Sequence, residues 1–186
     1  KNRIWIGSNS SIDIFLNEHN KIASFSYGEN GLHGDILRSV IEDSNSNLWV
    51  GVESSGLFKF KESLSNIKES IFSRLPFVEE EEEDLIIILN IAATSKGKLW
   101  ILANHLTLFD TNDNSFKEFK NFEPFTDAQF KALVLENDYT VWLSSTRGIW
   151  SFNAKDSIVE KYDKMDGFQS DFFMHSSTFK DKHGNL

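Results

Sequence analysis

The segment Asn47-Leu48-Trp49-Val50-Gly51, followed by Gly56-Leu57-Phe58-Lys59-Phe60, is the clearest copy of a phrase that occurs four times in this chain. Each copy has a tryptophan in a short apolar run and an aromatic residue 9 to 11 positions later; the pairs are Trp5 with Phe15, Trp49 with Phe60, Trp100 with Phe109, and Trp142 with Phe152. The intervals between the tryptophans are 44, 51 and 42 residues. A period of about 40–50 residues with several short strands per repeat is typical of a β-propeller, in which each repeat forms one blade.

Each repeat predicts the same four strands. An apolar strand leads through a polar turn into the tryptophan strand, a third strand carries the aromatic residue, and a ragged outer strand follows. We therefore expect an all-β chain of four-stranded antiparallel sheets, forming a partial arc of a seven-bladed propeller whose end faces are apolar. The expected divisions are a partial blade at about 1–30, blades at 31–78, 85–125 and 128–170, and the start of the next blade at 171–186.

Two segments have alternative interpretations. Ile67–Leu75 has apolar residues at helix-like spacing, but its place in the repeat requires an outer strand, which we favour. The six consecutive acids at 79–84 could bind a cation. Like-charge runs usually stay extended in water, so we favour a solvated insertion between two blades.

Composition excludes several classes of function. The formal net charge of −9 argues against binding to nucleic acid or to an anionic membrane surface, since both require a basic surface. The absence of cysteine excludes disulfides, thiolate metal sites and thiol nucleophiles. No apolar run reaches the roughly 18 residues that a membrane-spanning helix needs. The chain opens directly on a predicted strand without a signal peptide, so we expect a piece of a longer protein.

Two stretches resemble a known family. Arg38–Gly51, continued by Gly56–Phe60, resembles the two-component regulator propeller repeat, which has the form S-I-x-E-D-x-x-G-N-L-W-V-G-T followed by G-L-x-x-F. Asp166–Phe173 and Phe179–Leu186 look like the family's D-G-L-Q-S-N-x-F and F-K-D-K-x-G-N-L, which are typical of the last blades of a second propeller. The chain departs from the pattern in three places: Ser46 and Tyr139 replace turn glycines, and Ile101-Leu102 replaces Val-Gly-Thr.

The resemblance implies the periplasmic sensor region of a Bacteroides-type hybrid two-component system. Such proteins have two seven-bladed propellers, a β-sandwich and one membrane crossing, followed by histidine kinase, receiver and DNA-binding parts inside the cell. They detect oligosaccharides and regulate polysaccharide-utilisation genes. The implied partners are an oligosaccharide, the other propeller and β-sandwich of the same chain, and a second copy in a homodimer, with no nucleic acid contact by this region and no cofactor.

The tryptophans could stack on sugar rings, but a residue that recurs at one place in every repeat is better explained as part of the core. Trp150 is the exception, because the equivalent places hold Phe58 and Thr107. It is therefore a better candidate for ligand contact, although packing explains it too.

Ligand sites on propellers generally lie where loops enter the innermost strands, around the central channel. Non-repeating polar residues at those places are the candidate ligand-binding residues: Arg38, Asn90, Gln129, Lys131, Asp171 and His175. Arg38 and Lys131 each stand eleven residues before a tryptophan. Two such cations facing a channel would suit a uronate or sulfated sugar. The alternative is that each cation is solvated or paired locally.

An enzymatic function is less well supported. A propeller glycoside hydrolase needs two facing carboxylates, which a chain so rich in Asp and Glu neither shows nor excludes. A sialidase needs an arginine cluster, but the arginines are scattered at Arg3, Arg38, Arg74 and Arg147. The five histidines stand singly, so no metal site is indicated. We expect no catalytic and no metal-binding residues, and a protein-interaction scaffold remains the other alternative.

Overall fold

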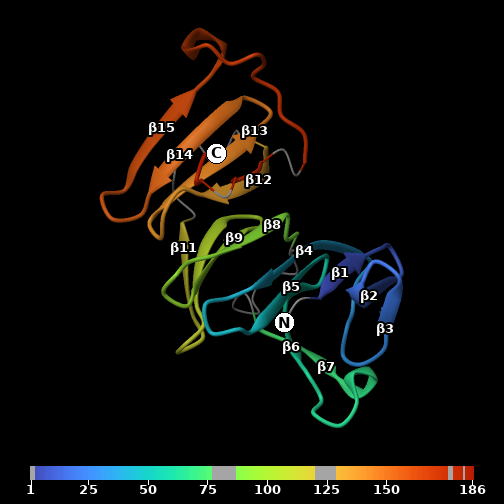
Figure 1. The fold of residues 1–186 in the computed structure, drawn as a ribbon. Helices are drawn as coiled ribbons and strands as arrows, with labels where there is room; N and C mark the ends of the chain where they lie inside the picture. The colour runs from blue at the N-terminus through green and yellow to red at the C-terminus, as the bar shows by residue number, and fades with distance from the viewer. Residues whose placement is uncertain (1–2, 77–86, 120–128, 176–177, 182) are drawn as a thin grey trace. The chain divides into compact units, whose positions relative to one another are not determined.

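The computed structural model describes residues 3–76, 87–119, 129–175, 178–181 and 183–186, and the acidic run 79–84 lies outside them. The described strands form antiparallel sheets in which each strand pairs with the next in the chain (Figure 1). The prediction of an all-β fold of four-stranded antiparallel sheets is confirmed. The described helical segments are single 3₁₀ turns, and none of them is long or apolar enough to cross a membrane.

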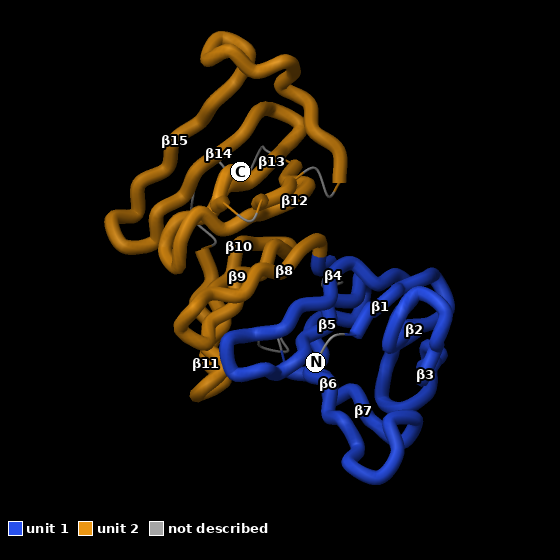
Figure 2. The backbone as a smooth tube through the Cα atoms, in the orientation of Figure 1, with its two compact units in different colours: residues 1–88 blue, residues 89–186 orange. Residues whose placement is uncertain are grey.

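The chain divides into two compact units, residues 1–88 and 89–186, which we describe separately (Figure 2). The first unit holds sheet 1, with β1 (Ile4–Gly7), β2 (Ser11–Asn17) and β3 (Asn20–Ser26), and sheet 2, with β4 (Ile36–Glu42), β5 (Leu48–Glu53), β6 (Gly56–Lys61) and β7 (Ile71–Arg74). The second unit holds sheet 3, with β8 (Asn90–Ala93), β9 (Lys98–Leu102), β10 (Leu106–Asp110) and β11 (Ser115–Phe119), and sheet 4, with β12 (Phe130–Leu135), β13 (Thr140–Ser145), β14 (Gly148–Asn153) and β15 (Ile158–Tyr162).

Two local predictions need correction. The segment expected to be a strand throughout 67–75 begins instead with a 3₁₀ turn, η1 (Ile67–Glu69), because the Asn66 side chain accepts a hydrogen bond from the backbone N–H of Lys68. The strand of this segment is β7, at Ile71–Arg74. The described residues of 171–186, where we expected the start of the next blade, form no regular strand, although the backbone N–H of Phe173 donates to the carbonyl of Ser145. A second 3₁₀ turn, η2 (Lys164–Asp166), precedes this segment.

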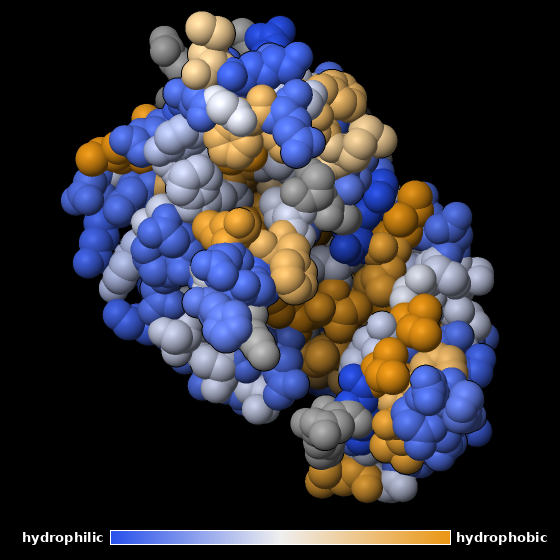
Figure 3. All heavy atoms as spheres, turned by 45° about the horizontal axis from the view of Figure 1, so that its top comes forward, coloured by the Kyte–Doolittle hydropathy of each residue, from blue (hydrophilic) through white to orange (hydrophobic). Residues whose placement is uncertain are grey.

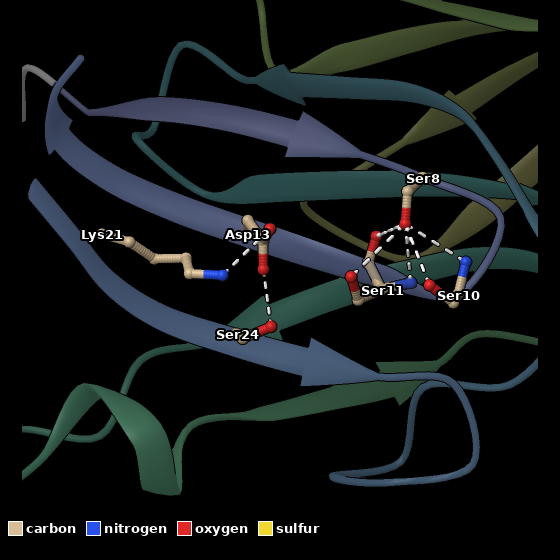
Figure 4. A network of polar contacts seen from close by, with 6 residues as sticks. All are labelled: Ser8, Ser10, Ser11, Asp13, Lys21 and Ser24. Atoms are coloured by element: carbon tan, nitrogen blue, oxygen red, sulfur yellow. Dashed lines mark hydrogen bonds and ion pairs between the residues drawn. The ribbon is translucent and has the colours of Figure 1, made fainter. Parts of the chain in front are cut away.

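Alternation of side chains explains the sheets. In β2, Ile12 and Ile14 are fully buried, whereas Asp13 between them points outward. The Asp13 carboxylate accepts a hydrogen bond from the Ser24 hydroxyl at 2.5 Å and lies 3.4 Å from the Lys21 ammonium, both on β3 (Figure 4). The hydroxyl of Ser8 accepts the backbone N–H groups of Ser10 and Ser11 and so closes the turn before β2.

The repeated tryptophans and aromatic residues pack on one another between neighbouring sheets of each unit. Within the first unit, Trp5 of sheet 1 meets Phe60 of sheet 2 edge-to-face, with ring centroids 5.0 Å apart. Within the second unit, Trp100 of sheet 3 meets Phe152 of sheet 4 in the same way, at 6.0 Å. In both units the tryptophan of one repeat therefore packs on the aromatic residue of the next repeat. Such pairs contribute about 0.5–1.5 kcal/mol beyond the area that they bury.

Burial of the tryptophans differs from the expectation. Trp49 and Trp100 are fully buried, but Trp5 and Trp142 are only partly buried. The ring of Trp142 lies 5.2 Å from Tyr162 of its own sheet, and its indole N–H donates to the exposed Glu136. The prediction that Trp142 is largely buried is therefore wrong in degree.

A buried carboxylate closes the turn between β4 and β5. Asp43 is only 5% exposed, and its carboxylate accepts hydrogen bonds from the backbone N–H groups of Asn45 and Asn47, from the Asn47 amide, and from the indole N–H of Trp49 at 2.7 Å. Burial alone would raise the pKa of Asp43, but the hydrogen bonds from Trp49 and Asn47 outweigh it and lower the pKa. In this turn Ser46 adopts a left-handed φ of 61° without the freedom of a glycine.

The equivalent turns use other side chains for the same purpose. Asp43, Thr94 and Glu136 stand six residues before Trp49, Trp100 and Trp142, and Asp181 lies in a similar turn near the end of the chain. Thr94 closes its turn through its hydroxyl, which accepts the N–H of Lys98, and Asp181 accepts the N–H groups of His183 and Asn185. Glu136 instead accepts the indole N–H of Trp142 at 2.8 Å, while Asn137 closes the turn. Tyr139, where the pattern has a glycine, is not left-handed, because this turn closes differently.

Hydrophobic and hydrophilic residues both reach the surface on the face drawn in Figure 3, and the exposed large apolar side chains before residue 160 are Ile4, Ile6, Leu16, Leu64, Ile71 and Ile158. The last 22 residues are different, since six exposed apolar side chains gather there: Met165, Phe168, Phe172, Met174, Phe179 and Leu186.

We predict that Phe152→Ala lowers the free energy of unfolding by about 3–5 kcal/mol, because Phe152 is fully buried against Trp100 and Phe119 and its loss leaves a cavity. Urea unfolding measures the change. Phe179→Ala is the control, since Phe179 is 77% exposed and its replacement should change stability by less than about 0.5 kcal/mol. Equal effects of the two substitutions would contradict the packing described above.

We also predict that Asp43→Asn lowers the free energy of unfolding by about 1.5–3 kcal/mol, since an amide cannot accept all of these hydrogen bonds. Because the pKa of Asp43 is lowered in the fold, its stabilising effect is present above the unfolded-state pKa and is lost as the pH falls through the folded-state pKa. Unfolding curves from neutral to acidic pH should therefore converge for the wild type and the variant. A difference that persists in acid would contradict this role.

Candidate ligand-binding site

Arg38 and Lys131 occupy the same structural position in different sheets. The pairing of β4 with β5 shifts between Leu37 and Ser39, and the pairing of β12 with β13 shifts between Phe130 and Ala132. Each cation is therefore the extra residue of a β-bulge in the first strand of its sheet. Bulges redirect a side chain and occur often beside binding sites. Arg38 and Lys131, which stand at equal distances before their tryptophans, thus also stand at equivalent bulges of their sheets.

The two cations have different surroundings. The Arg38 guanidinium is paired with the Glu53 carboxylate of β5, with its Nε 2.6 Å from Glu53 Oε2, and both side chains are about a quarter exposed. Arg38 is thus a locally paired charge, the alternative that the sequence left open. Lys131 is partly buried, and no hydrogen bond or ion pair is seen for its ammonium among the described residues. Lys131 is the cation of the two that remains available to a ligand.

Three of the predicted ligand-binding residues bond to the turn between β13 and β14, which contains the buried Ser145. Its hydroxyl donates to the carbonyl of Gly148 at 2.9 Å and accepts the indole N–H of Trp150 at 3.3 Å. In the same turn, the N–H of Thr146 donates to the carbonyl of Gln129, and the N–H of Gly148 donates to the carbonyl of Asp171. Gln129, Trp150 and Asp171 therefore meet at one end of sheet 4, next to Lys131 on β12.

These three residues differ in what they offer a ligand. Gln129 is exposed and uses only its backbone carbonyl in the turn. The carboxylate of Asp171 accepts the backbone N–H of Lys164 at 2.8 Å, which gives it a structural role. Trp150 packs edge-to-face on Phe130, with centroids 6.4 Å apart, and the ammonium of Lys161 lies 5.5 Å from its ring. Trp150 is therefore mainly a packing residue that is still partly exposed.

The remaining candidates lie near this group. Asn90 begins β8, whose neighbour within the second unit is β12, so its partly exposed side chain stands on the strand beside Lys131. His175 is exposed and follows the segment that bonds to Ser145. Within the described residues, no group of three His, Cys, Asp or Glu side chains is arranged to hold a metal ion.

Sequence reasoning missed two residues that shape the site, Ser145 and Glu53. Ser145 stands at the Thr of the repeat pattern W-V-G-T, so a hydroxyl at that place was visible in the sequence. Glu53 has no comparable signal, because only strand pairing places it beside the bulge at Arg38. Every buried side-chain nitrogen or oxygen in the described residues has a hydrogen-bond partner.

We predict that Ser145→Ala loosens the turn between β13 and β14 and costs about 1–3 kcal/mol, because the N–H of Arg147 and the indole N–H of Trp150 lose an acceptor. Hydrogen exchange at Thr146 and Gly148 should accelerate more than exchange in the strands. Ser157→Ala, in an exposed turn of the same sheet, is the control and should change neither quantity. Unchanged exchange at Gly148 in Ser145→Ala would contradict the central role of this hydroxyl.

Comparison with known proteins supports the fold. No family model and no curated protein matches the sequence. The extracellular domain of BT4673 from Bacteroides thetaiotaomicron, named as a one component system in one structure and a hybrid two component system in another, matches with a TM-score of 0.77 at 17% identity; the match covers 99% of this chain and 24% of that chain. The extracellular domain of the hybrid two component system BT3049 from the same organism matches with a TM-score of 0.64 at 17% identity, covering 92% and 22% of the two chains.

Propellers from other settings also match. The Cps50 (Swd1) β-propeller domain of Myceliophteria thermophila gives a TM-score of 0.64 at 10% identity and covers 98% of this chain and 56% of that chain. At such low identities these likenesses establish the fold. The chain spans about a quarter of the length of the Bacteroides chains that it matches. This chain is thus a β-propeller segment similar to the extracellular domains of Bacteroides thetaiotaomicron two-component sensors.

Proposed function

We propose that this chain is part of an extracytoplasmic sensor domain that binds an oligosaccharide and thereby regulates genes for polysaccharide use. The observation that carries the proposal is the structural likeness to the BT4673 extracellular domain over 99% of the chain. The repeat pattern around Trp49 supports the same family independently of the coordinates.

The proposed ligand contacts are the groups at the first strands of sheets 3 and 4. Gln129, Asn90 and His175 present polar side chains that are at least partly exposed, and sugar hydroxyls need such donors and acceptors. Trp150 offers an aromatic surface beside them. Lys131 supplies an ammonium for a uronate or a sulfated sugar, because hydrogen bonds to ionised groups are the strong ones.

The wider arrangement is proposed for the intact protein. A periplasmic location, contact with a second propeller and a β-sandwich, a homodimer, and a histidine kinase beyond the membrane follow from the family resemblance. A sensor of this kind would transmit ligand binding as a change in domain or subunit arrangement, which requires different ligand affinities in two states.

We predict that Lys131→Ala weakens binding of an acidic oligosaccharide to the intact sensor region by about 1–3 kcal/mol, the usual effect of losing a hydrogen bond to a charged group. A screen of defined neutral and acidic oligosaccharides first identifies the ligand, and isothermal titration then compares the variants. Arg38→Ala should have a smaller effect, since Glu53 already pairs with Arg38.

Lys117→Ala is the matched control, because Lys117 is a lysine of sheet 3 whose ammonium lies over the ring of Phe119. Unchanged affinity in Lys131→Ala would contradict the proposal that the Lys131 ammonium binds the acidic group of the ligand. A neutral ligand would instead shift the expected losses to Gln129 and Trp150. A screen that finds no sugar but a protein partner would favour the protein-interaction scaffold.

A further inference from the structure

Three turns of the second unit converge around Tyr139. Lys96 lies in the turn between β8 and β9, Tyr139 in the turn between β12 and β13, and Lys155 in the turn between β14 and β15. The Lys96 ammonium lies 3.0 Å from the Tyr139 hydroxyl and 5.1 Å from the centroid of its ring. The Lys155 ammonium lies 4.3 Å from the same centroid. Two cations thus share one aromatic ring.

Hydrogen bonds between the turns hold this arrangement in place. The carboxylate of Asp138 accepts the backbone N–H of Ser95 at 2.8 Å and its hydroxyl at 2.6 Å, which joins the turn of sheet 3 to that of sheet 4. The indole N–H of Trp100 donates to the carbonyl of Asp138. The N–H of Ala154, next to Lys155, donates to the carbonyl of Tyr139. The backbone of all three turns is therefore preorganised.

The charge of the Asp138 carboxylate acts on Lys96, but among the described residues this carboxylate forms no ion pair with either lysine. Its two oxygens accept hydrogen bonds from the backbone N–H and the hydroxyl of Ser95. Lys96 donates one hydrogen bond to Tyr139, and no ion pair is seen for Lys96 or Lys155 among the described residues. Like charges near one another repel, and an anion between them would relieve the repulsion. Most N–H donors of the two ammonium groups remain available for its oxygens.

We propose that Lys96, Tyr139 and Lys155 form a binding site for one oxyanion group, a sulfate or a carboxylate. The two ammonium groups and the phenol hydroxyl can donate charge-assisted hydrogen bonds to such a group. Because Lys155 covers the ring, the group is held by polar contacts and not by stacking of a sugar on Tyr139. This site lies at the opposite end of β13 from Ser145 and does not depend on the proposed oligosaccharide site.

The first test is isothermal titration of the chain with galactose 6-sulfate, galacturonate, galactose and sodium sulfate, with sodium chloride used to match ionic strength. The double variant Lys96→Gln/Lys155→Gln should lower the affinity for the sulfated and carboxylated sugars at least tenfold. The control Lys61→Gln/Lys117→Gln removes the same net charge at other places and should change affinity less than twofold.

The arms of the titration distinguish the source of the anion. Tighter binding of galactose 6-sulfate than of sodium sulfate would assign the site to acidic saccharides, and equal binding would assign it to the free ion. Galactose should not bind here. Equal losses in the two double variants would mean diffuse electrostatic attraction and would overturn the proposal, as would unchanged affinity in Lys96→Gln/Lys155→Gln.

The second test uses the ionisation of Tyr139. The hydrogen bond from Lys96, with the charge of Lys96, lowers the pKa of Tyr139, whereas burial raises that of Tyr27 and the hydrogen bond with Glu160 raises that of Tyr162. Tyr139 should therefore be the first of the three tyrosines to ionise in an ultraviolet titration, and Tyr139→Phe should remove that step. Sulfate should raise the pKa of this step by compensating the lysine charges. No shift beyond that in sodium chloride would contradict anion binding.

Discussion

The hydrogen bond between the Asp43 carboxylate and the indole of Trp49 ties together the turn, the strand and the core of sheet 2. A carboxylate that is almost entirely buried is tolerable only when hydrogen bonds replace its water. Here backbone N–H groups, an amide and the indole do so. The turn therefore cannot close without placing Trp49, and Trp49 cannot turn away without leaving a buried charge unpaired. The geometry of the first two strands of the sheet follows from this mutual dependence.

The other repeats keep the function of this turn with different chemistry. Thr94 closes its turn but has no second oxygen for the tryptophan, so the indole of Trp100 donates to the carbonyl of Asp138 in the next sheet. One substitution within the repeat thus converts a contact inside a sheet into a contact between two sheets. The same inter-sheet joint brings Lys96 beside Tyr139. The proposed oxyanion site therefore lies where the repeat has Thr94 in place of the aspartate and where Trp100 bonds to the neighbouring sheet.

The candidate site illustrates how equal sequence positions become unequal in the structure. Arg38 and Lys131 share a register and a β-bulge, yet Arg38 pairs with Glu53 and Lys131 does not have such a partner in the described residues. Glu53 stands four residues after Trp49, and the same place after Trp142 holds Thr146, which has no charge to neutralise a cation and whose backbone N–H donates to the carbonyl of Gln129. The partner across the strand therefore decides whether a cation is structural or available.

The amino-acid sequence by itself determined the repeat, the all-β class, the order of strands and the register of Arg38 and Lys131, because strand periodicity and turn residues are local properties. It also indicated Trp150 and Gln129 as exceptions to the repeat. Only the tertiary structure decided that Phe152 packs on the tryptophan of the preceding repeat, that Glu53 pairs with Arg38, and that Lys96 and Lys155 meet at Tyr139. These contacts join residues of different strands or sheets, and their partners are set by strand pairing and sheet stacking, which no local pattern encodes.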